Sequence, residues 1–276
     1  MDEEREQVVV GALEAMGDPR TMLRWRRGEP DYVAAVALTE ADVPVLLATA
    51  RRWLERENWP KDKDDLSIYA PIHAWRALGQ LRASAAVGTL LGLLDGLDDA
   101  DDDWYLEEMP EVFGLIGPAA LAELATYLAD DGHRLFPRIC VANGHCCVGQ
   151  RYPAAREAVL AVLTEQLRRY EVNEHELNAF LISYLLSLGA VEAAEVIERA
   201  YAARRVDEEI VGNWDTVRRD LGVTGLGLVP EEQARRRPSF GLWGASPEPQ
   251  HGRSQARQQR RQNRKRQRQN RKRNRR

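Results

Sequence analysis

Three cysteines and a histidine crowd into one short stretch and are the residues best suited to bind a metal. Cys140, Cys146 and Cys147 fall within eight positions, with His145 among them, and cysteine and histidine are the ligands that zinc prefers. On a helix, however, Cys140 and Cys147 share a face but lie about 10 Å apart, while His145 and Cys146 point elsewhere. The spacing therefore favours a buried face of small side chains, because free cysteine packs as a small hydrophobe.

The densest acidic stretch has the chemistry to bind a divalent cation or a basic peptide. It comprises Asp95, Asp98, Asp99, Asp101, Asp102 and Asp103. A calcium loop starting at Asp99 would put Trp104 where the tight turn needs glycine, and Pro110 where a bidentate glutamate is needed. We therefore expect a loop between helices, with several acids at the positive N-terminus of a helix that begins near Trp104. A cation or basic-peptide site is the alternative.

The histidines and paired carboxylates form no recognisable catalytic motif. His73 lies beside an apolar stripe, and His145 and His175 have no Ser, Cys or Asp partner at the spacing of a triad. Adjacent carboxylates, such as Glu107 and Glu108, diverge on a helix. The sequence contains none of the common nucleotide-binding, zinc-protease or serine-hydrolase signatures. We expect structural histidines and no catalytic, cofactor-binding or metal-binding residues.

Two tryptophans lie among arginines, a combination that can hold single strands of nucleic acid by stacking and charge. Trp25 has three arginines around it, and Trp53 follows Arg51 and Arg52. On a helix, the simpler arrangement turns each tryptophan into the core while the arginines reach water. We expect this core arrangement.

The last 26 residues differ in charge from the rest of the chain. Residues 251–276 hold 13 of the 39 basic residues and no acid, so residues 1–250 keep 26 basic against 43 acidic residues, a formal charge of −17. The tail has no aromatic or large aliphatic side chain from which to build a core, which predicts disorder. Its expected polyanion-binding residues are Arg260, Arg261, Arg264, Lys265, Arg266, Arg268, Arg271, Lys272, Arg273, Arg275 and Arg276.

Arginine-rich tails of this kind favour phosphate contacts, with RNA or DNA as the expected ligand and acidic lipid as another. Two alternatives remain open. The tail could neutralise the acidic body, within one chain or between copies, or it could have no specific role.

Apolar stripes with helical spacing position all these residues. From residue 68 onward they predict four pairs of helices, over residues 68–81 and 84–97, 104–116 and 118–129, 135–149 and 153–170, and 174–188 and 191–204. Matched by their stripes, the second helices align Leu90, Leu124, Val162 and Ile197, in steps of 34, 38 and 35 residues. A period of this size is typical of two-helix repeats that stack and share one core. An ordinary helical bundle is the alternative.

The flanking regions complete an all-α prediction with four parts. Residues 1–62 are expected to form a helical cap, with a helix over 39–57, and residues 63–221 the repeats, closed by a helix over 207–221. Glycines and a proline make residues 222–250 a linker, with a short helix possible over 231–236, and residues 251–276 are the tail.

Three segments give this organisation a resemblance to a known family. They are Ile68–Leu81 (IYAPIHAWRALGQL), Asp101–Val112 (DDDWYLEEMPEV) and Val206–Trp214 (VDEEIVGNW). They resemble bacterial HEAT-repeat proteins, of the type labelled PBS-lyase-like or grouped with uncharacterised domains, over residues 39–221. The resemblance implies a HEAT-like α-solenoid, an array of helical hairpins, and no particular activity.

Together these features predict a monomeric, cytoplasmic scaffold. The acidic start does not resemble a secretory signal, the longest apolar stretch has thirteen residues where a bilayer needs roughly twenty, and three clustered cysteines fit a reducing compartment. We expect a non-enzymatic scaffold that binds an unknown protein partner through its acidic repeats and a polyanion through its tail. The alternative is a lyase-type or other enzyme with a dispersed active site.

Overall fold

The computed structural model describes residues 3–22, 24–55, 62, 65–224 and 227–228. Within them the chain is helical apart from one short hairpin, which confirms the all-α class. The chain divides into two units, residues 1–228 and 229–276, and the described residues all belong to the first. The predicted tail, most of the predicted linker and the short helix predicted over 231–236 lie outside the described residues.

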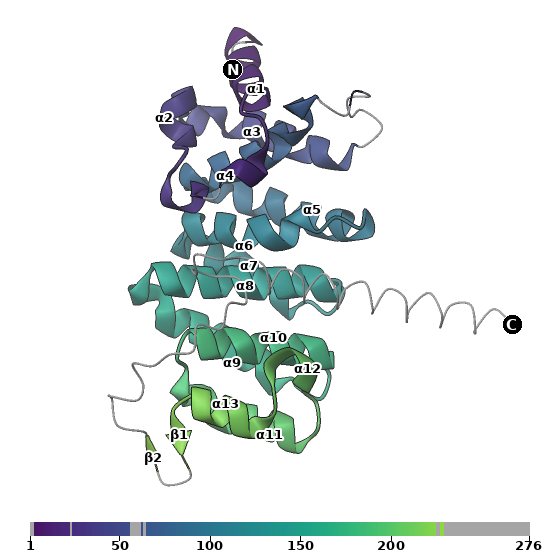
Figure 1. Cartoon of the computed structure of the whole chain (residues 1–276), viewed down its shortest axis with the longest axis vertical. Helices are drawn as coiled ribbons and strands as arrows, with labels where there is room; N and C mark the ends of the chain where they lie inside the picture. Colours follow the sequence, from purple (N-terminus) through teal and green to yellow (C-terminus); the bar gives the residue numbers. More distant parts are fainter. Residues whose placement is uncertain (1–2, 23, 56–61, 63–64, 225–226, 229–276) are drawn as a thin grey trace, which may run out of the picture. The chain divides into compact units, whose positions relative to one another are not determined.

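Consecutive helical pairs make up most of the first unit, and Figure 1 shows them one below another in chain order. The first members are α4 (Ala70–Gln80), α6 (Trp104–Ile116), α8 (Leu135–Arg151) and α10 (His175–Ser187). The second members are α5 (Val87–Asp99), α7 (Leu121–Ala129), α9 (Arg156–Arg168) and α11 (Ala194–Ala202). First members pack on first members, and second members on second members, so the pairs form two layers. The four predicted pairs are therefore present.

Every second member begins with a single 3-10 turn, at Ser84–Ala86, Pro118–Ala120, Pro153–Ala155 and Val191–Ala193. The third residue of each turn is a buried alanine, and six residues after each turn begins lies a buried aliphatic residue, namely Leu90, Leu124, Val159 and Ile197. The steps are 34, 35 and 38 residues. The predicted alignment of Val162 is wrong, because α9 carries valine or leucine at 159, 160, 162 and 163, and Val162 is only half-buried.

The first-layer helices approach closely because glycines lie at their contacts. A Cβ on Gly114 would lie 2.7 Å from the Cβ of Cys147, and one on Gly79 would lie 3.2 Å from the Cα of Val112. Cys147 and the other two cysteines are buried in α8 as free thiols. The predicted small-residue helix face is thus confirmed, and its use is to let neighbouring helices pack at short range.

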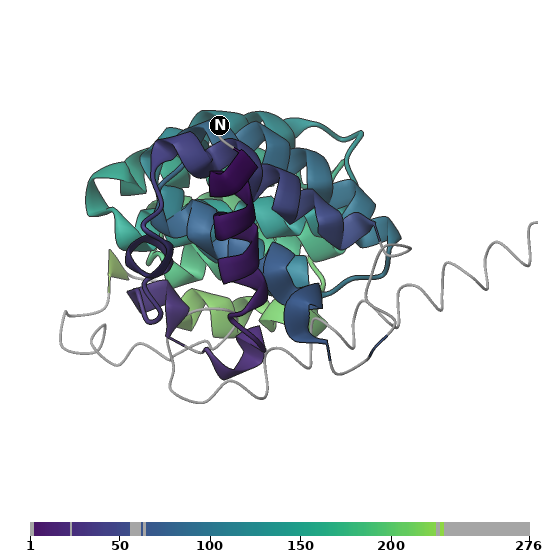
Figure 2. The same cartoon turned by 90° about the horizontal axis from the view of Figure 1, so that it is seen from above.

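The N-terminal segment covers one end of the stack, as the view from above in Figure 2 shows. It contains α1 (Glu3–Glu14), α2 (Tyr32–Val36) and α3 (Val43–Arg51). The helix predicted over 39–57 is shorter: α3 has a 3-10 turn before it, at Glu40–Asp42, and another after it, at Arg52–Leu54. The Asp42 carboxylate accepts hydrogen bonds from Arg5 Nε (2.8 Å) and the Thr39 amide (2.8 Å), which lowers the pKa of Asp42 to about 2.

The other end of the stack differs from the prediction of one closing helix over 207–221. Gly212, with φ at 87°, ends α12 (Glu208–Val211), and the Asn213 side chain accepts a hydrogen bond from the Thr216 amide at the start of α13 (Trp214–Asp220). Only glycine adopts such a φ without strain. Beyond α13, β1 (Val223–Thr224) pairs antiparallel with β2 (Gly227–Leu228), in a stretch predicted as linker.

Candidate functional site

Along one edge of the stack, arginines link consecutive turns. Arg134, Arg169 and Arg205 repeat at 35 and 36 residues, and they lie in or beside the turns that lead into α8, α10 and α12. Arg134 pairs with Asp99 at the C-terminus of α5 at 2.5 Å, and Arg205 Nε donates to the Tyr170 carbonyl at 3.3 Å. Carbonyls at the C-termini of helices otherwise lack partners. The arginines therefore tie each pair to the one before it.

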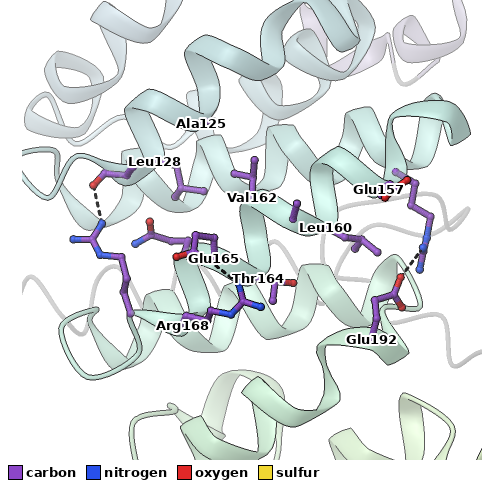
Figure 3. Close-up of a pocket in the computed structure, with 14 residues that line it drawn as sticks. Ala125, Leu128, Glu157, Leu160, Val162, Thr164, Glu165, Arg168 and Glu192 are labelled. Carbon is purple, nitrogen blue, oxygen red and sulfur yellow. Dashed lines mark hydrogen bonds and ion pairs between the residues drawn. The ribbon is translucent and has the colours of Figure 1, made fainter.

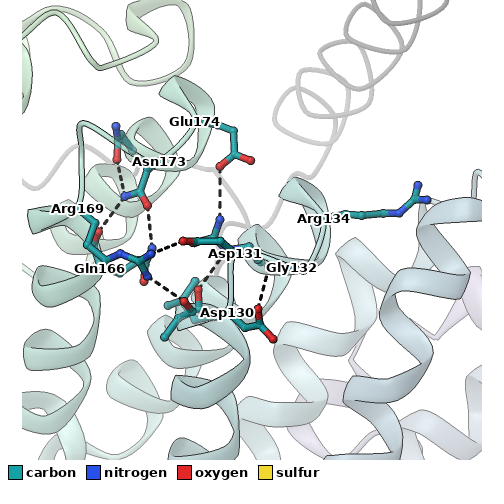
Figure 4. Close-up of polar contacts among 12 residues, drawn as sticks. Asp130, Asp131, Gly132, Arg134, Gln166, Arg169, Asn173 and Glu174 are labelled. Atoms are coloured by element: carbon teal, nitrogen blue, oxygen red, sulfur yellow. Dashed lines mark hydrogen bonds and ion pairs between the residues drawn. The ribbon is translucent and has the colours of Figure 1, made fainter.

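Figure 4 shows the middle of these links, where Asp131 accepts from two arginines. Arg169 pairs with Asp131 and donates to the Ala129 carbonyl (2.8 Å), while the buried Arg138 donates to Asp131 Oδ1 (3.0 Å) and to the Leu128 carbonyl (3.1 Å). A buried guanidinium requires such partners. These bonds hold the end of α7 against both α8 and α9.

The opposite end of α9 is held by Arg156. Its guanidinium donates to the carbonyls of Leu188 (3.2 Å) and Gly189 (3.1 Å) and pairs with Glu192 (2.9 Å) in the turn before α11. Both ends of α9 are therefore anchored to neighbouring pairs by arginine.

An open groove of about 1020 Å3 runs along α9 between these anchors. Figure 3 shows its lining, which comes mostly from α9, with α7 and the turn before α11 completing it. The apolar part consists of Ala125, Leu128, Ala129, Leu160, Ala161 and Val162, and the polar part of Arg156, Glu157, Thr164, Glu165, Gln166, Arg168, Arg169 and Glu192. Sequence reasoning missed this site. The one sequence feature that could have indicated the groove was Val162, an extra apolar residue beside the core stripe of α9.

The groove combines an apolar floor with a rim on which three arginines and three glutamates balance in charge. Its three arginines are each paired with an acid: Arg156 with Glu192 (2.9 Å), Arg168 with Glu165 (2.6 Å) and Arg169 with Asp131. Glu157 is exposed, and among the described residues its carboxylate has no partner. The formal charges of the residues that line the groove therefore sum to zero, and Arg169 has its partner Asp131 outside the lining.

A second polar cluster is buried where the cap meets the stack. Arg76 of α4 and Glu108 of α6 form a two-bond pair of 2.9 and 2.8 Å, and the Trp25 ring lies 4.9 Å from the guanidinium carbon. Arg76 is 3% exposed. It also donates to the Pro19 carbonyl (3.2 Å), so the pair joins the cap to two repeats. Because the polar groups of this cluster are buried and hydrogen-bonded to one another, the cluster joins parts of this chain and does not present a site to a ligand.

His73 belongs to the same cluster. Its Nε2 lies 2.9 Å from the Gly17 carbonyl, and its Nδ1 lies 2.8 Å from the Tyr32 hydroxyl. A carbonyl can only accept, so Nε2 carries the proton and Tyr32 donates to Nδ1. Burial lowers the pKa of His73 to about 4, which keeps the ring neutral at physiological pH. The predicted structural role of this histidine is confirmed.

The cysteine and histidine stretch of α8 shows no sign of metal or nucleophilic chemistry. Burial raises the pKa of Cys146 to about 12 and that of Cys140 and Cys147 well above the usual range, so the thiols stay protonated. Burial lowers the pKa of the fully buried His145 to about 4. Within the described residues, no group of three or more candidate ligands could hold a metal ion.

The predicted loop and helix start cover only part of the acidic stretch, because Asp95, Asp98 and Asp99 belong to the end of α5, and only residues 101–103 lie in the loop before α6. Asp102 accepts from the Trp53 indole (2.7 Å) and from the Trp104 amide (2.7 Å), and Asp98 accepts from the Tyr105 hydroxyl (3.0 Å). Asp98 and Asp102 are both buried, so these two carboxylates serve the packing of α5 and α6.

The tryptophans among arginines are buried in the core, as predicted, with 2% of Trp25 and 3% of Trp53 exposed.

The eleven predicted tail residues lie outside the described residues, so the structure does not bring them to any site. Across the described residues, no single helix is both long and apolar enough to cross a bilayer. Trp104–Ile116 and Pro118–Ala129 are long and apolar enough only when taken together, and this pair is bent by 107°.

Comparison with known proteins adds no relative. The chain matches no family model, no curated protein and no solved structure. The resemblance to HEAT-repeat proteins therefore has no support from these comparisons.

Proposed function

We propose that the protein is a non-enzymatic scaffold, a HEAT-like α-solenoid in the cytoplasm whose acidic repeats bind a protein partner and whose Arg-rich tail binds a polyanion. The solenoid proposal is supported by the two layers of like helices. It is further supported by the steps of 34 to 38 residues between equivalent positions in the second members. Neighbouring repeats that share a core in this way form extended surfaces suited to binding.

The observation that carries the proposal is the separation of charge along the chain. Residues 1–250 have a formal charge of −17, while residues 251–276 contain thirteen cations and no acid. An acidic body repels phosphate, so a polyanion would engage the tail. The predicted contacts are those of Arg and Lys with phosphate oxygens of RNA or DNA.

The alternative, an enzyme with a dispersed site, has less support from the geometry. Catalytic sites usually combine an enclosed pocket with convergent polar groups. The groove along α9 is open, and its rim arginines are engaged in ion pairs. The buried cluster around His73 and Arg76 is closed by its own hydrogen bonds.

Deleting residues 251–276 tests the proposal. We expect the truncated chain to lose salt-sensitive retention on immobilised single-stranded RNA. We also expect its melting temperature to stay the same, because the inter-repeat contacts described above lie within residues 3–222. Undiminished retention of the truncated chain refutes the role of the tail.

A further inference from the structure

We propose that His133 forms a pH-sensitive link between the first two helical pairs, and that protonation of its ring tightens this link. The link joins α5, the second member of the first pair, to the turn that leads from α7 into α8. It is a regulatory device of the fold itself, and it stands independently of the proposed scaffold function.

The ring of His133 lies between two carboxylates that come from different helical pairs. Its Nδ1 lies 2.8 Å from Asp95 Oδ2 on α5, and its Nε2 lies 3.8 Å from Asp130 Oδ2 in its own turn. A carboxylate can only accept a hydrogen bond, so Nδ1 carries the proton of the neutral ring. The neutral ring therefore has no proton to offer to Asp130.

The surroundings of His133 hold both the ring and the carboxylates in position. The ring stacks on Tyr127 of α7, with the ring centroids 3.5 Å apart and the planes inclined by 10°. The Tyr127 hydroxyl donates to Asp95 Oδ2 at 3.1 Å. In the turn, the Gly132 amide donates to Asp130 Oδ1 at 2.8 Å, as Figure 4 shows. Both acceptors are thus in place before the ring is protonated.

The other titratable groups around this histidine add no net positive charge. The Arg134 guanidinium lies 3.7 Å from Asp98 and 2.5 Å from Asp99, both at the end of α5. Burial raises the pKa of the Tyr127 hydroxyl and that of the Cys140 thiol near it, so both groups stay neutral in the pH range in which histidine titrates. A positive charge on the ring is therefore surrounded mainly by carboxylates.

Protonation makes the ring a donor on both sides. The imidazolium keeps its hydrogen bond to Asp95 and gains an ion pair with Asp130. Because histidine ordinarily changes charge between pH 5 and 8, we expect the link to be tighter at the acidic end of this range and to loosen as the pH rises. Asp130 is exposed, so the gain corresponds to that of a surface ion pair, about two- to fivefold in the opening equilibrium of the turn.

Hydrogen exchange of the full chain measures this opening. Peptides that cover residues 128–134 report on the turn, and their protection factors are compared at pH 7.5 and pH 5.5 after correction for the intrinsic exchange rates. We expect protection in the turn to rise about two- to fivefold at the lower pH. Peptides from α10, which contributes no residue to the link, show any change in global stability.

Two substitutions separate the ion pair from the hydrogen bond of the neutral ring. His133→Gln keeps a neutral side chain that can donate to Asp95, and Asp130→Asn keeps the oxygen that accepts from the Gly132 amide but removes the charge. Both should abolish the gain in protection at pH 5.5 and change protection at pH 7.5 by less than about twofold. The matched control is His175→Gln, an exposed histidine at the start of α10, which should retain the gain.

The inference is overturned if the native chain shows no gain in the turn, or if His133→Gln or Asp130→Asn retains it. Loss of the gain in the His175→Gln control also overturns it, because the effect would then not belong to the link. Circular dichroism confirms that each variant is folded before exchange is measured, and each of the two substitutions at the link decides the question without the other.

Discussion

Single glycines set the spacing of the first-layer helices, and Gly114 is the tightest of those contacts. The Cβ of an alanine at 114 would lie 2.7 Å from Cys147 Cβ, which belongs to the next first-layer helix and cannot easily move away. Overpacking of a well-packed core typically costs about 1–3 kcal/mol. We expect Gly114→Ala to lower the free energy of unfolding by that amount, as measured by urea denaturation.

Gly92 provides the matched control, because it is an exposed glycine within α5 with no atom within 4 Å of an added Cβ. Alanine has the higher helix propensity by about 0.5–1 kcal/mol, so Gly92→Ala should stabilise the protein. Equal effects of the two substitutions would show that Gly114 is not required for the close approach of α6 and α8.

Buried histidines make stability depend on pH in a predictable direction. The pKa of His73 is lowered by burial to about 4, below the value of about 6.5 for an unfolded chain. Between those values the unfolded state binds more protons, so stability falls as the pH drops from 6.5 towards 4. His145 acts in the same direction. Urea denaturation at pH 7 and pH 5 should show this loss, and His73→Gln should reduce it; an unchanged pH dependence in the variant contradicts the assignment.

At the scale of the elements, arginines in the turns hold neighbouring helical pairs together. Arg169 donates to the Ala129 carbonyl and pairs with Asp131 across a repeat boundary, whereas Arg168 pairs only with Glu165 on its own helix. Hydrogen bonds from charged groups contribute about 1.5–3 kcal/mol, and exposed helical pairs about 0.3–0.5 kcal/mol.

The substitution Arg169→Ala should therefore destabilise the protein by about 1–3 kcal/mol, and Arg168→Ala by less than about 0.5 kcal/mol. Thermal and urea unfolding of the two variants measure the difference. If Arg168→Ala is as damaging as Arg169→Ala, the links between turns do not carry the stability assigned to them.

Elements with a strong helical period were predictable from sequence, and their interruptions were not. The apolar stripes placed the four pairs from α4 to α11 correctly, because an amphipathic face has a local signature. The break at Gly212 was missed because Asp207–Leu221 keeps enough apolar spacing to resemble one helix. The alignment of Val162 failed because α9 offers two overlapping stripes, and its packing against neighbouring helices, chiefly α8 and α10, decides between them.

The groove was harder to predict from the sequence than the helices were. Its lining brings together residues of α7, α9 and the following turn, which are neighbours only after the pairs have stacked. Cys140, Cys146, Cys147 and His145, which appeared the most reactive in sequence, proved to be packing residues. Helical geometry had already separated these side chains, so their structural role was the predictable part.

At the scale of the whole molecule, one chain combines an acidic helical stack with a cationic tail. The stack presents paired arginines and spare carboxylates, and thirteen cations follow in residues 251–276. A polyanion and a protein partner would then be recognised by different parts of one chain. Such a division of charge lets a scaffold hold two unlike ligands without competition between them.

The salt dependence of RNA binding by the full chain tests this division most directly. If the tail engages about eight phosphates of a single-stranded RNA, the logarithm of the binding constant should fall with the logarithm of salt concentration with a slope of roughly −6. The chain truncated after residue 250 should show no measurable RNA binding at any salt concentration in the series. A slope near zero for the full chain, or the same slope for the truncated chain, contradicts the account.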